Sequence, residues 1–450
     1  MSTRFDLPQP GAPTAVHFPP IARETMPGGL RVWSIPAPAA PLAAVLLVVE
    51  HGSARDPEDQ PGLVGLTADL MDEGAGNLDA IAVADAFMRL GTHLEIEVAP
   101  DVTTFGLTAL TRVLPEALAL LADVVIRPRL EARDFDRIRD LRLNRLRQLS
   151  RSPSAVANRV FNGAVFAAHP YARGTLGTTV ALRTLSADDT RAQWAEGFER
   201  AGATLVVAGD VTLDAIRPVV ERTFGTWGGG RPRTPLPAVS LAGGDAAVLL
   251  VDRPGASQSE LRVGHSGPPR RTEAYFTLLT LNAVLGGQFS SRINRNLRET
   301  RGVTYGARTA FEFRRAGGSF GCDTSVQSDA TADAIAEILR EFETIRSEPV
   351  GEDELALARS SLTRGYVRNF ETAVQLGRAG AQLAVHDLGS ETYDDFVPIV
   401  GRQRTADLAA AAHAYLQPDR STIVVVGDRE TIQPSLAALG RPVRVVTPEF

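Results

Sequence analysis

The chain has 450 residues, 44% of them hydrophobic and 22% charged, which is typical of a globular protein with two or three domains. All 47 basic residues are arginines, and the absence of lysine excludes Schiff-base chemistry and the Gly-x-x-x-x-Gly-Lys phosphate loop. The net charge of −6 argues against a general nucleic-acid-binding protein. The single cysteine, Cys322, excludes an intrachain disulfide, and we interpret it as an inert core residue.

No apolar run reaches the roughly 18–20 residues of a membrane helix. The sequence does not open with a charged segment followed by an apolar one, which is the pattern of a signal peptide. We therefore expect a cytoplasmic protein as the sequence is written, or a periplasmic one if a leader has been removed.

In chain order, the pattern predicts a helix over residues 63–71, a strand over 103–110 and a helix over 115–125. An arginine-rich amphipathic helix follows over 137–151. We interpret its basic face as a solvated surface paired with nearby acids, because a phosphate-binding face would normally lie in a basic domain. An apolar strand over 204–210 then ends in Gly-Asp.

A Gly/Pro-rich segment over residues 228–244 predicts an extended linker. Beyond it the order of elements repeats: a strand over 318–325, a helix over 331–345, and an apolar strand over 422–428 that again ends in Gly-Asp. Strands and helices are mixed without strict alternation, which favours an α+β fold. We predict two homologous α/β-roll domains, residues 1–227 and 245–450, each with a mainly antiparallel sheet packed with helices.

Local motifs give little chemistry by themselves. No two of the seven histidines lie within four positions, so no helical histidine pair can bind a metal. Gly317-Gly-Ser-Phe-Gly321 has the letters of a nucleophile elbow but runs into a strand, so we interpret it as a hairpin or bulge.

One polar segment, residues 285–306, brings together two groups of interest. It predicts a helix over 290–300, a turn at Gly302 and a strand from Val303, which places Arg298 close to Tyr305. A guanidinium and a phenol can both donate hydrogen bonds to a carbonyl or a developing oxyanion. Composition alone favours two ordinary structural residues, because an arginine at the end of a helix and a tyrosine in a strand are common.

Four stretches of the chain resemble the pitrilysin/insulinase family of zinc peptidases, which includes the mitochondrial processing peptidase. They are Gly28 to Val32, Gln60 to Met71, His169-Pro-Tyr-Ala-Arg173 with Gly177, and Leu285 to Tyr305. They occur in the family's order, and the internal repeat agrees with the family's paired α+β halves.

The resemblance also shows where the chain departs from the family. The two zinc-binding histidines of the His-x-x-Glu-His motif would fall at Gly65 and Asp69, the general-base glutamate at Ala68, and the third ligand near Arg145. Glycine and alanine cannot ligate a metal, and arginine carries a fixed positive charge. We therefore expect no metal and no cofactor in this chain, with zinc in a partner subunit.

The family's Arg/Tyr pair, by contrast, is retained at Arg298 and Tyr305. The resemblance implies a non-zinc subunit of a heteromeric metallopeptidase, inactive alone, that uses this pair for peptide binding and oxyanion stabilisation at a partner's zinc. The expected partners are a homologous subunit with the intact motif and a peptide substrate. The alternatives are an inactive structural or assembly subunit, like the respiratory-chain core proteins, and a peptide-binding homodimer.

Overall fold

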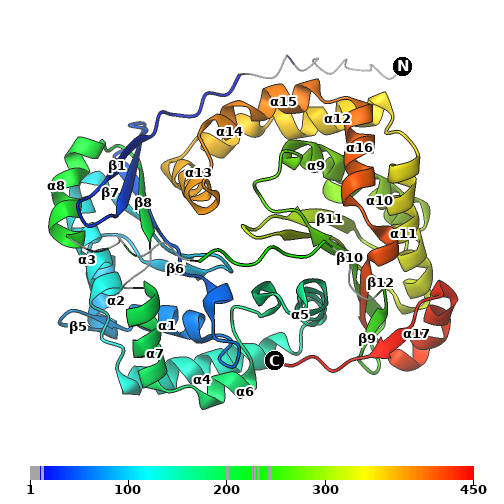
Figure 1. Cartoon of the computed structure of the whole chain (residues 1–450), viewed down its shortest axis with the longest axis horizontal. Helices are drawn as coiled ribbons and strands as arrows, with labels where there is room; N and C mark the ends of the chain where they lie inside the picture. Colours follow the sequence, from blue (N-terminus) through cyan, green and yellow to red (C-terminus); the bar gives the residue numbers. More distant parts are fainter. Residues whose placement is uncertain are drawn as a thin grey trace, which may run out of the picture.

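Two six-stranded sheets form the framework of the protein (Figure 1). The structure, a computed structural model, describes residues 11, 15–198, 202–225, 227, 230, 234–241 and 246–450. In spatial order, the N-terminal sheet contains β1 (Ala22–Thr25), β2 (Arg31–Pro36), β8 (Ala203–Gly209), β3 (Leu42–Val49), β7 (Thr103–Leu110) and β6 (Glu95–Val98). The C-terminal sheet contains β14 (Val443–Val445), β9 (Val248–Asp252), β13 (Thr422–Gly427), β10 (Gln258–Gly267), β12 (Gly318–Gln327) and β11 (Ala307–Glu312).

The predicted internal repeat is confirmed by the way the strands pair. The two apolar Gly-Asp runs form β8 and β13, which occupy equivalent places in their sheets. Each pairs in parallel with one neighbour, β2 or β9, and antiparallel with the other, β3 or β10. The remaining pairs are antiparallel except β9 with β14, so both sheets are mainly antiparallel and the α+β class is confirmed.

Helices surround the two sheets, and a two-stranded ribbon of β4 (Gly74–Ala75) and β5 (Leu78–Asp79) follows the first helix. The N-terminal half contains α1 (Leu63–Met71), α2 (Ala80–Arg89), α3 (Leu114–Ile126), α4 (Ala132–Leu149), α5 (Pro153–Phe166), α6 (Thr179–Thr184), α7 (Ala187–Gln193) and α8 (Leu213–Phe224). The C-terminal half contains α9 (Tyr275–Asn282), α10 (Arg292–Asn294), α11 (Thr331–Ser347), α12 (Glu352–Thr363), α13 (Ala373–His386), α14 (Glu391–Asp394), α15 (Phe396–Arg402), α16 (Thr405–Tyr415) and α17 (Arg429–Leu436).

Each half covers one face of the other half's sheet with a helix (Figure 1). Helix α13 lies on β3 and β8 of the N-terminal sheet, and α5 lies on β10 and β13 of the C-terminal sheet. Because both faces of the sheet are covered, β8 is buried along its whole length. Leu205 and Val207 face the core of their own half, whereas Val206 and Ala208 face α13. The two halves therefore interlock and do not fold as independent units joined only by the linker.

The structure describes only part of the predicted linker. Residues 228–229, 231–233 and 242–244 lie outside the described residues. The described segment 234–241 crosses between the halves, and Val239 is buried there, its amide donating to the carbonyl of Ala316 at 2.8 Å. Val239 thus fixes the described part of the linker to the C-terminal half, while most of the other side chains of this segment are exposed.

Candidate functional site

The helix that aligns with the family's zinc motif is α1, and a buried carboxylate fixes its start. Gly62 precedes the helix with a φ of +97°, and the Asp56 carboxylate accepts hydrogen bonds from the amides of Gly62 and Val64, both at 2.7 Å. Burial raises the pKa of Asp56 to about 6, against the lowering effect of these two bonds. Asp56 therefore anchors the first turn of α1.

The three motif positions on α1 have very different surroundings. Ala68 is fully buried in the core of the N-terminal half, so its side chain does not reach a site. Asp69 is partly exposed and forms an ion pair with Arg142. At Gly65, an added Cβ would overlap Nη2 of Arg142 and lie 2.6 Å from the carbonyl oxygen of Thr175. The Arg142 guanidinium thus fills the space that a side chain at residue 65 would need.

Of the two arginines close to the expected third-ligand position, the structure places Arg142, and not Arg145, beside Gly65 and Asp69. Arg145 is exposed and donates only to the side chain of Gln148, at 3.0 Å. Arg142, one turn earlier on α4, has a side chain that is 6% exposed, and its Nη2 donates to the carbonyl of Thr175 at 2.8 Å. The spacing of residues in the sequence already indicates that Arg142 is buried. Arg142 lies four residues from both Ile138 and Leu146, on the buried side of α4.

This arrangement does not fit a zinc ion. A glycine, a buried alanine, an aspartate already paired with arginine and a buried guanidinium offer neither the donors nor the charge that Zn²⁺ requires. Among the residues that the structure describes, no three histidine, cysteine, aspartate or glutamate side chains gather in a group able to hold a metal ion.

The second candidate site is the turn that carries Arg298 and Tyr305. A π-helical turn, Arg295–Thr300, follows α10, Gly302 has a φ of +67°, and β11 begins only at Ala307. Tyr305 therefore lies in the turn and not in the strand predicted from Val303. The buried side chain of Asn294 holds the turn, because its amide donates to the carbonyl of Ala307 at 2.8 Å and accepts from the same residue's amide at 3.0 Å.

Additional bonds make this turn rigid while its side chains point outward. The amide of Val303 donates to the carbonyl of Leu297 at 3.0 Å, and Thr324 Oγ1 donates to the carbonyl of Gly306 at 3.0 Å. Tyr305 is nevertheless 96% exposed. The Tyr305 side chain therefore faces the solvent from a turn that hydrogen bonds hold in place.

Arg298 is held differently. Its guanidinium lies over the ring of Phe289, 3.6 Å from the ring centroid, and Phe289 is itself 68% exposed. Nη1 of Arg298 is buried and has no hydrogen-bond partner among the described residues. No hydrogen bond or ion pair joins Arg298 to Tyr305 in the described part of the chain. Sequence reasoning predicted the two residues but missed Phe289 and Asn294, which fix their surroundings.

The His-Pro-Tyr segment, residues 169–171, forms hydrogen bonds to the linker and to both halves of the protein. His169 Nδ1 accepts from the amide of Tyr171 at 3.1 Å, so Nε2 carries the proton and donates to Pro237 of the linker at 2.8 Å. Burial lowers the pKa of His169, which favours this neutral form. The Tyr171 hydroxyl donates to Asp101 and accepts from the amide of Ala316 at 3.1 Å. These contacts support the interpretation of the segment as structural.

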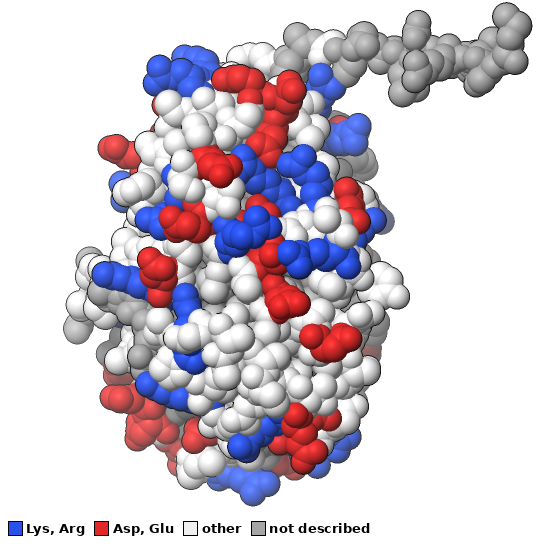
Figure 2. Space-filling model, turned by 90° about the vertical axis from the view of Figure 1, so that its right-hand side faces the viewer, with Lys and Arg blue, Asp and Glu red and all other residues white. Residues whose placement is uncertain are grey.

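The distribution of charge on the outer surface shows which kinds of partner the protein is suited to bind. Figure 2 shows acidic and basic side chains interspersed over the face of the C-terminal half, without one large basic patch. On α4, Arg137 pairs with Glu73 and Arg139 with Asp136, whereas Arg145 and Arg147 bond to the neutral side chains of Gln148 and Asn144. Within the described ranges, no helix has the length and apolarity required to cross a bilayer.

Two repeated α+β halves, with a motif helix that lacks its metal ligands, define a protein built on a duplicated peptidase fold. Family models agree: insulinase (peptidase family M16) matches residues 31–179, and the peptidase M16 inactive domain matches residues 184–362. The chain belongs to peptidase family M16, the insulinase family.

Relatives and solved structures match over most of the chain. An uncharacterized zinc protease of Mycobacterium tuberculosis is 27% identical over 383 residues, covering 84% of this chain and 87% of the relative. One of Streptomyces coelicolor is 24% identical over 422 residues, 91% of each chain. A peptidase M16 inactive domain from Pseudomonas fluorescens superposes with a TM-score of 0.83 at 22% identity, covering 91% of this chain and 98% of that one. A Helicobacter pylori protease gives 0.82 at 18% identity, covering 91% and 99%.

Proposed function

We propose that this chain is the non-zinc subunit of a heteromeric zinc metallopeptidase and supplies Arg298 and Tyr305 to a site on a homologous partner. The observation that carries the proposal is the braced turn, which leaves Tyr305 96% exposed while Arg298 retains a buried donor without a partner.

The division of labour follows from the chemistry of each chain. The zinc and its activated water would come from the partner, whose first helix carries the intact His-x-x-Glu-His motif. In this chain, the Tyr305 hydroxyl donates to the oxyanion that forms when the peptide carbonyl is attacked, and the Arg298 guanidinium donates to a neighbouring carbonyl. The Arg142 guanidinium fills the space beside Gly65, as expected for a subunit that does not bind zinc.

The turn's rigidity matters for this role. Donors stabilise a transition state most when they are already in place and need no reorganisation during the reaction. The paired hydrogen bonds from Asn294 to Ala307 hold the turn in that way without using either functional side chain.

The test mixes this chain with an M16 homologue from the same organism that carries the intact motif, and follows cleavage of quenched fluorescent peptides. We expect cleavage by the mixture and little by either chain alone. If the homologue cleaves equally well alone, the proposal is wrong, and the structural or assembly role becomes the better explanation. Cleavage that needs neither a partner nor added metal would contradict both.

A further inference from the structure

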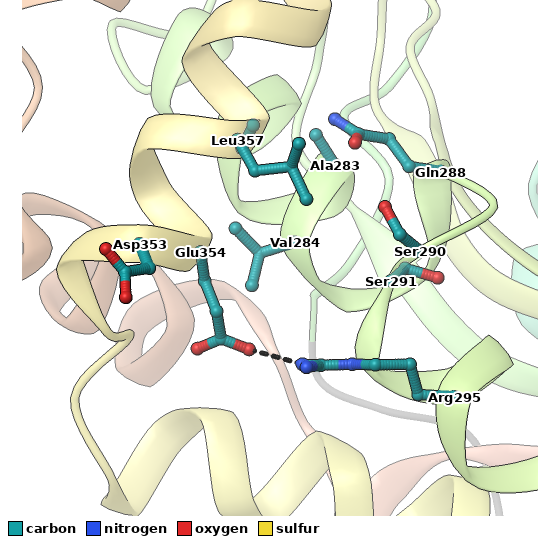
Figure 3. A pocket seen from close by; sticks show the side chains of 10 residues that line it. Ala283, Val284, Gln288, Ser290, Ser291, Arg295, Asp353, Glu354 and Leu357 are labelled. Atoms are coloured by element: carbon teal, nitrogen blue, oxygen red, sulfur yellow. Dashed lines mark hydrogen bonds and ion pairs between the residues drawn. The ribbon is translucent and has the colours of Figure 1, made fainter. Parts of the chain in front are cut away.

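A small hollow lies beside the Arg298 turn, between residues 288–291 and α12 (Figure 3). Its volume is about 160 Å³, and its floor consists of Ala283, Val284 and Ala358, which are each almost fully buried. Leu357 forms one wall and is half exposed, and its side chain points toward Val284 and Ala283. A cavity of roughly 150 Å³ is large enough to hold a benzene ring. The hollow therefore matches one branched or aromatic side chain.

Most of the charged groups at its rim form one network of ion pairs. Nη2 of Arg295 is 2.8 Å from Oε1 of Glu354, and the same carboxylate accepts two bonds from Arg292, at 2.7 and 3.0 Å. Ser291 Oγ accepts from Asn294 Nδ2 at 3.2 Å. Two polar groups remain beside this network: the exposed carboxylate of Asp353 and Nε2 of Gln288, which is buried without a partner among the described residues. The floor itself is apolar, and an apolar group gains most from covering it.

The hollow adjoins the π-helical turn that carries Arg298, because Arg295 of the same turn lines it. Gln288 and Ser290 line it, and between them stands Phe289, whose exposed ring supports the Arg298 guanidinium. A peptide with a carbonyl at Arg298 would thus pass close to the mouth of the hollow.

We propose that this hollow is a specificity pocket that receives one apolar side chain, of leucine or phenylalanine size, from the bound peptide. The inference rests on the proposed function for the identity of the occupant, but the pocket's preference for apolar groups is a property of this chain alone. The full burial of such a side chain corresponds to about a 10–100-fold preference over serine.

The first experiment tests the pocket without any partner. N-acetyl-leucinamide and N-acetyl-serinamide are titrated into the full chain, and the methyl NMR signals of Val284 and Ala283 are followed. We expect saturating shifts at millimolar leucinamide and none with serinamide. Leu357→Asp, which puts a charge at the mouth, should abolish the shifts, and Leu141→Asp, a matched change at an exposed leucine of α4, should not. Shifts that persist in Leu357→Asp, or none at all, would overturn the pocket.

The second experiment tests the occupant. The mixture with the zinc-binding homologue is given peptides that carry leucine or serine at successive positions, and kcat/KM is compared. We expect a 10–100-fold preference for leucine at one position, lost in Leu357→Asp while cleavage of the serine peptides is retained. Cleavage that depends on Tyr305 but shows no such loss overturns the specificity role and leaves the proposed function intact. Leucinamide binding without any cleavage by the mixture overturns both the proposed function and the peptide as occupant.

Discussion

The contacts of the buried Arg142 beside Gly65 can be tested by Arg142→Ala. The variant removes the ion pair with Asp69 and the bond to the carbonyl of Thr175. Breaking a buried ion pair costs about 3–5 kcal/mol, but the Asp69 carboxylate is 41% exposed and can be resolvated, so we expect about 2–3 kcal/mol. The unpaired Thr175 carbonyl adds about 1 kcal/mol. The total loss should be about 3–4 kcal/mol.

The assay is urea unfolding followed by circular dichroism, with Arg145→Ala as the matched control on the same helix. Arg145 is exposed and bonds only to Gln148, so its removal should change the free energy of unfolding by less than about 0.5 kcal/mol. Equal losses in the two variants, or a larger loss in Arg145→Ala, would refute the buried pairing of Arg142 with Asp69 and Thr175.

Three further predictions concern the surroundings of Gly65, the packing of α13 and the burial of His386. Gly65→Ala should destabilise by about 1–3 kcal/mol, because its Cβ meets the Thr175 carbonyl, whereas Gly163→Ala, in open space within α5, should stabilise by about 0.5–1 kcal/mol in the same unfolding assay. Gly380→Val should cost about 1–3 kcal/mol, since a Cβ there lies 2.8 Å from Ile35 and Val206 of the other half's sheet; limited proteolysis should then release α13. His386→Gln should flatten the loss of stability on acidification, measured by unfolding at pH 7 and pH 4.

The sign of the pH effect follows from the direction of the pKa shift. Burial, and then nearby Arg270, lower the pKa of His386 from 6.5 to about 4. Between these values the unfolded chain binds a proton that the folded chain does not, so the folded protein loses stability as the pH falls through this window. Removing the imidazole should favour the variant over the wild type by about 3 kcal/mol on going from pH 7 to pH 4. An unchanged difference between the two proteins would contradict the burial of a neutral His386.

Gly163→Ala and Gly380→Val also serve as checks on each other. A large loss from both would show that any added side chain disturbs these helices, and would remove the support for a specific interlock between the halves. A neutral Gly380→Val would contradict the close packing of α13 on the N-terminal sheet.

Local elements were predictable because their signals lie within a few residues. Strand β7, Thr103–Leu110, and helix α1, Leu63–Met71, begin and end where the alternation and the Pro61-Gly62 break predict. The continuous apolar runs likewise identified β8 and β13 as buried strands. The repeat then gave the fold class, since two similar series of elements predict two similar sheets.

What the sequence could not reveal depends on contacts between distant segments. An apolar helix face shows that α5 and α13 must be covered, but not that each covers the other half's sheet. The buried Arg142 stands where an apolar residue would continue the stripe of α4, yet the aligned position pointed to Arg145. The predicted strand position of Tyr305 was wrong. The side chain of Asn294 bonds to the backbone amide and carbonyl of Ala307, and β11 begins only at that residue.

The most direct test of the proposed role is to replace Tyr305 by Phe in the mixture with the zinc-binding homologue, at concentrations where the two chains are fully assembled. Tyr305 is exposed, so the variant should fold and bind its partner as the wild type does, which analytical ultracentrifugation can confirm. We predict that kcat falls by about 10²–10³-fold, because the oxyanion loses one preorganised donor. An assembled complex with unchanged turnover would show that Tyr305 has no part in catalysis and would contradict the proposed function.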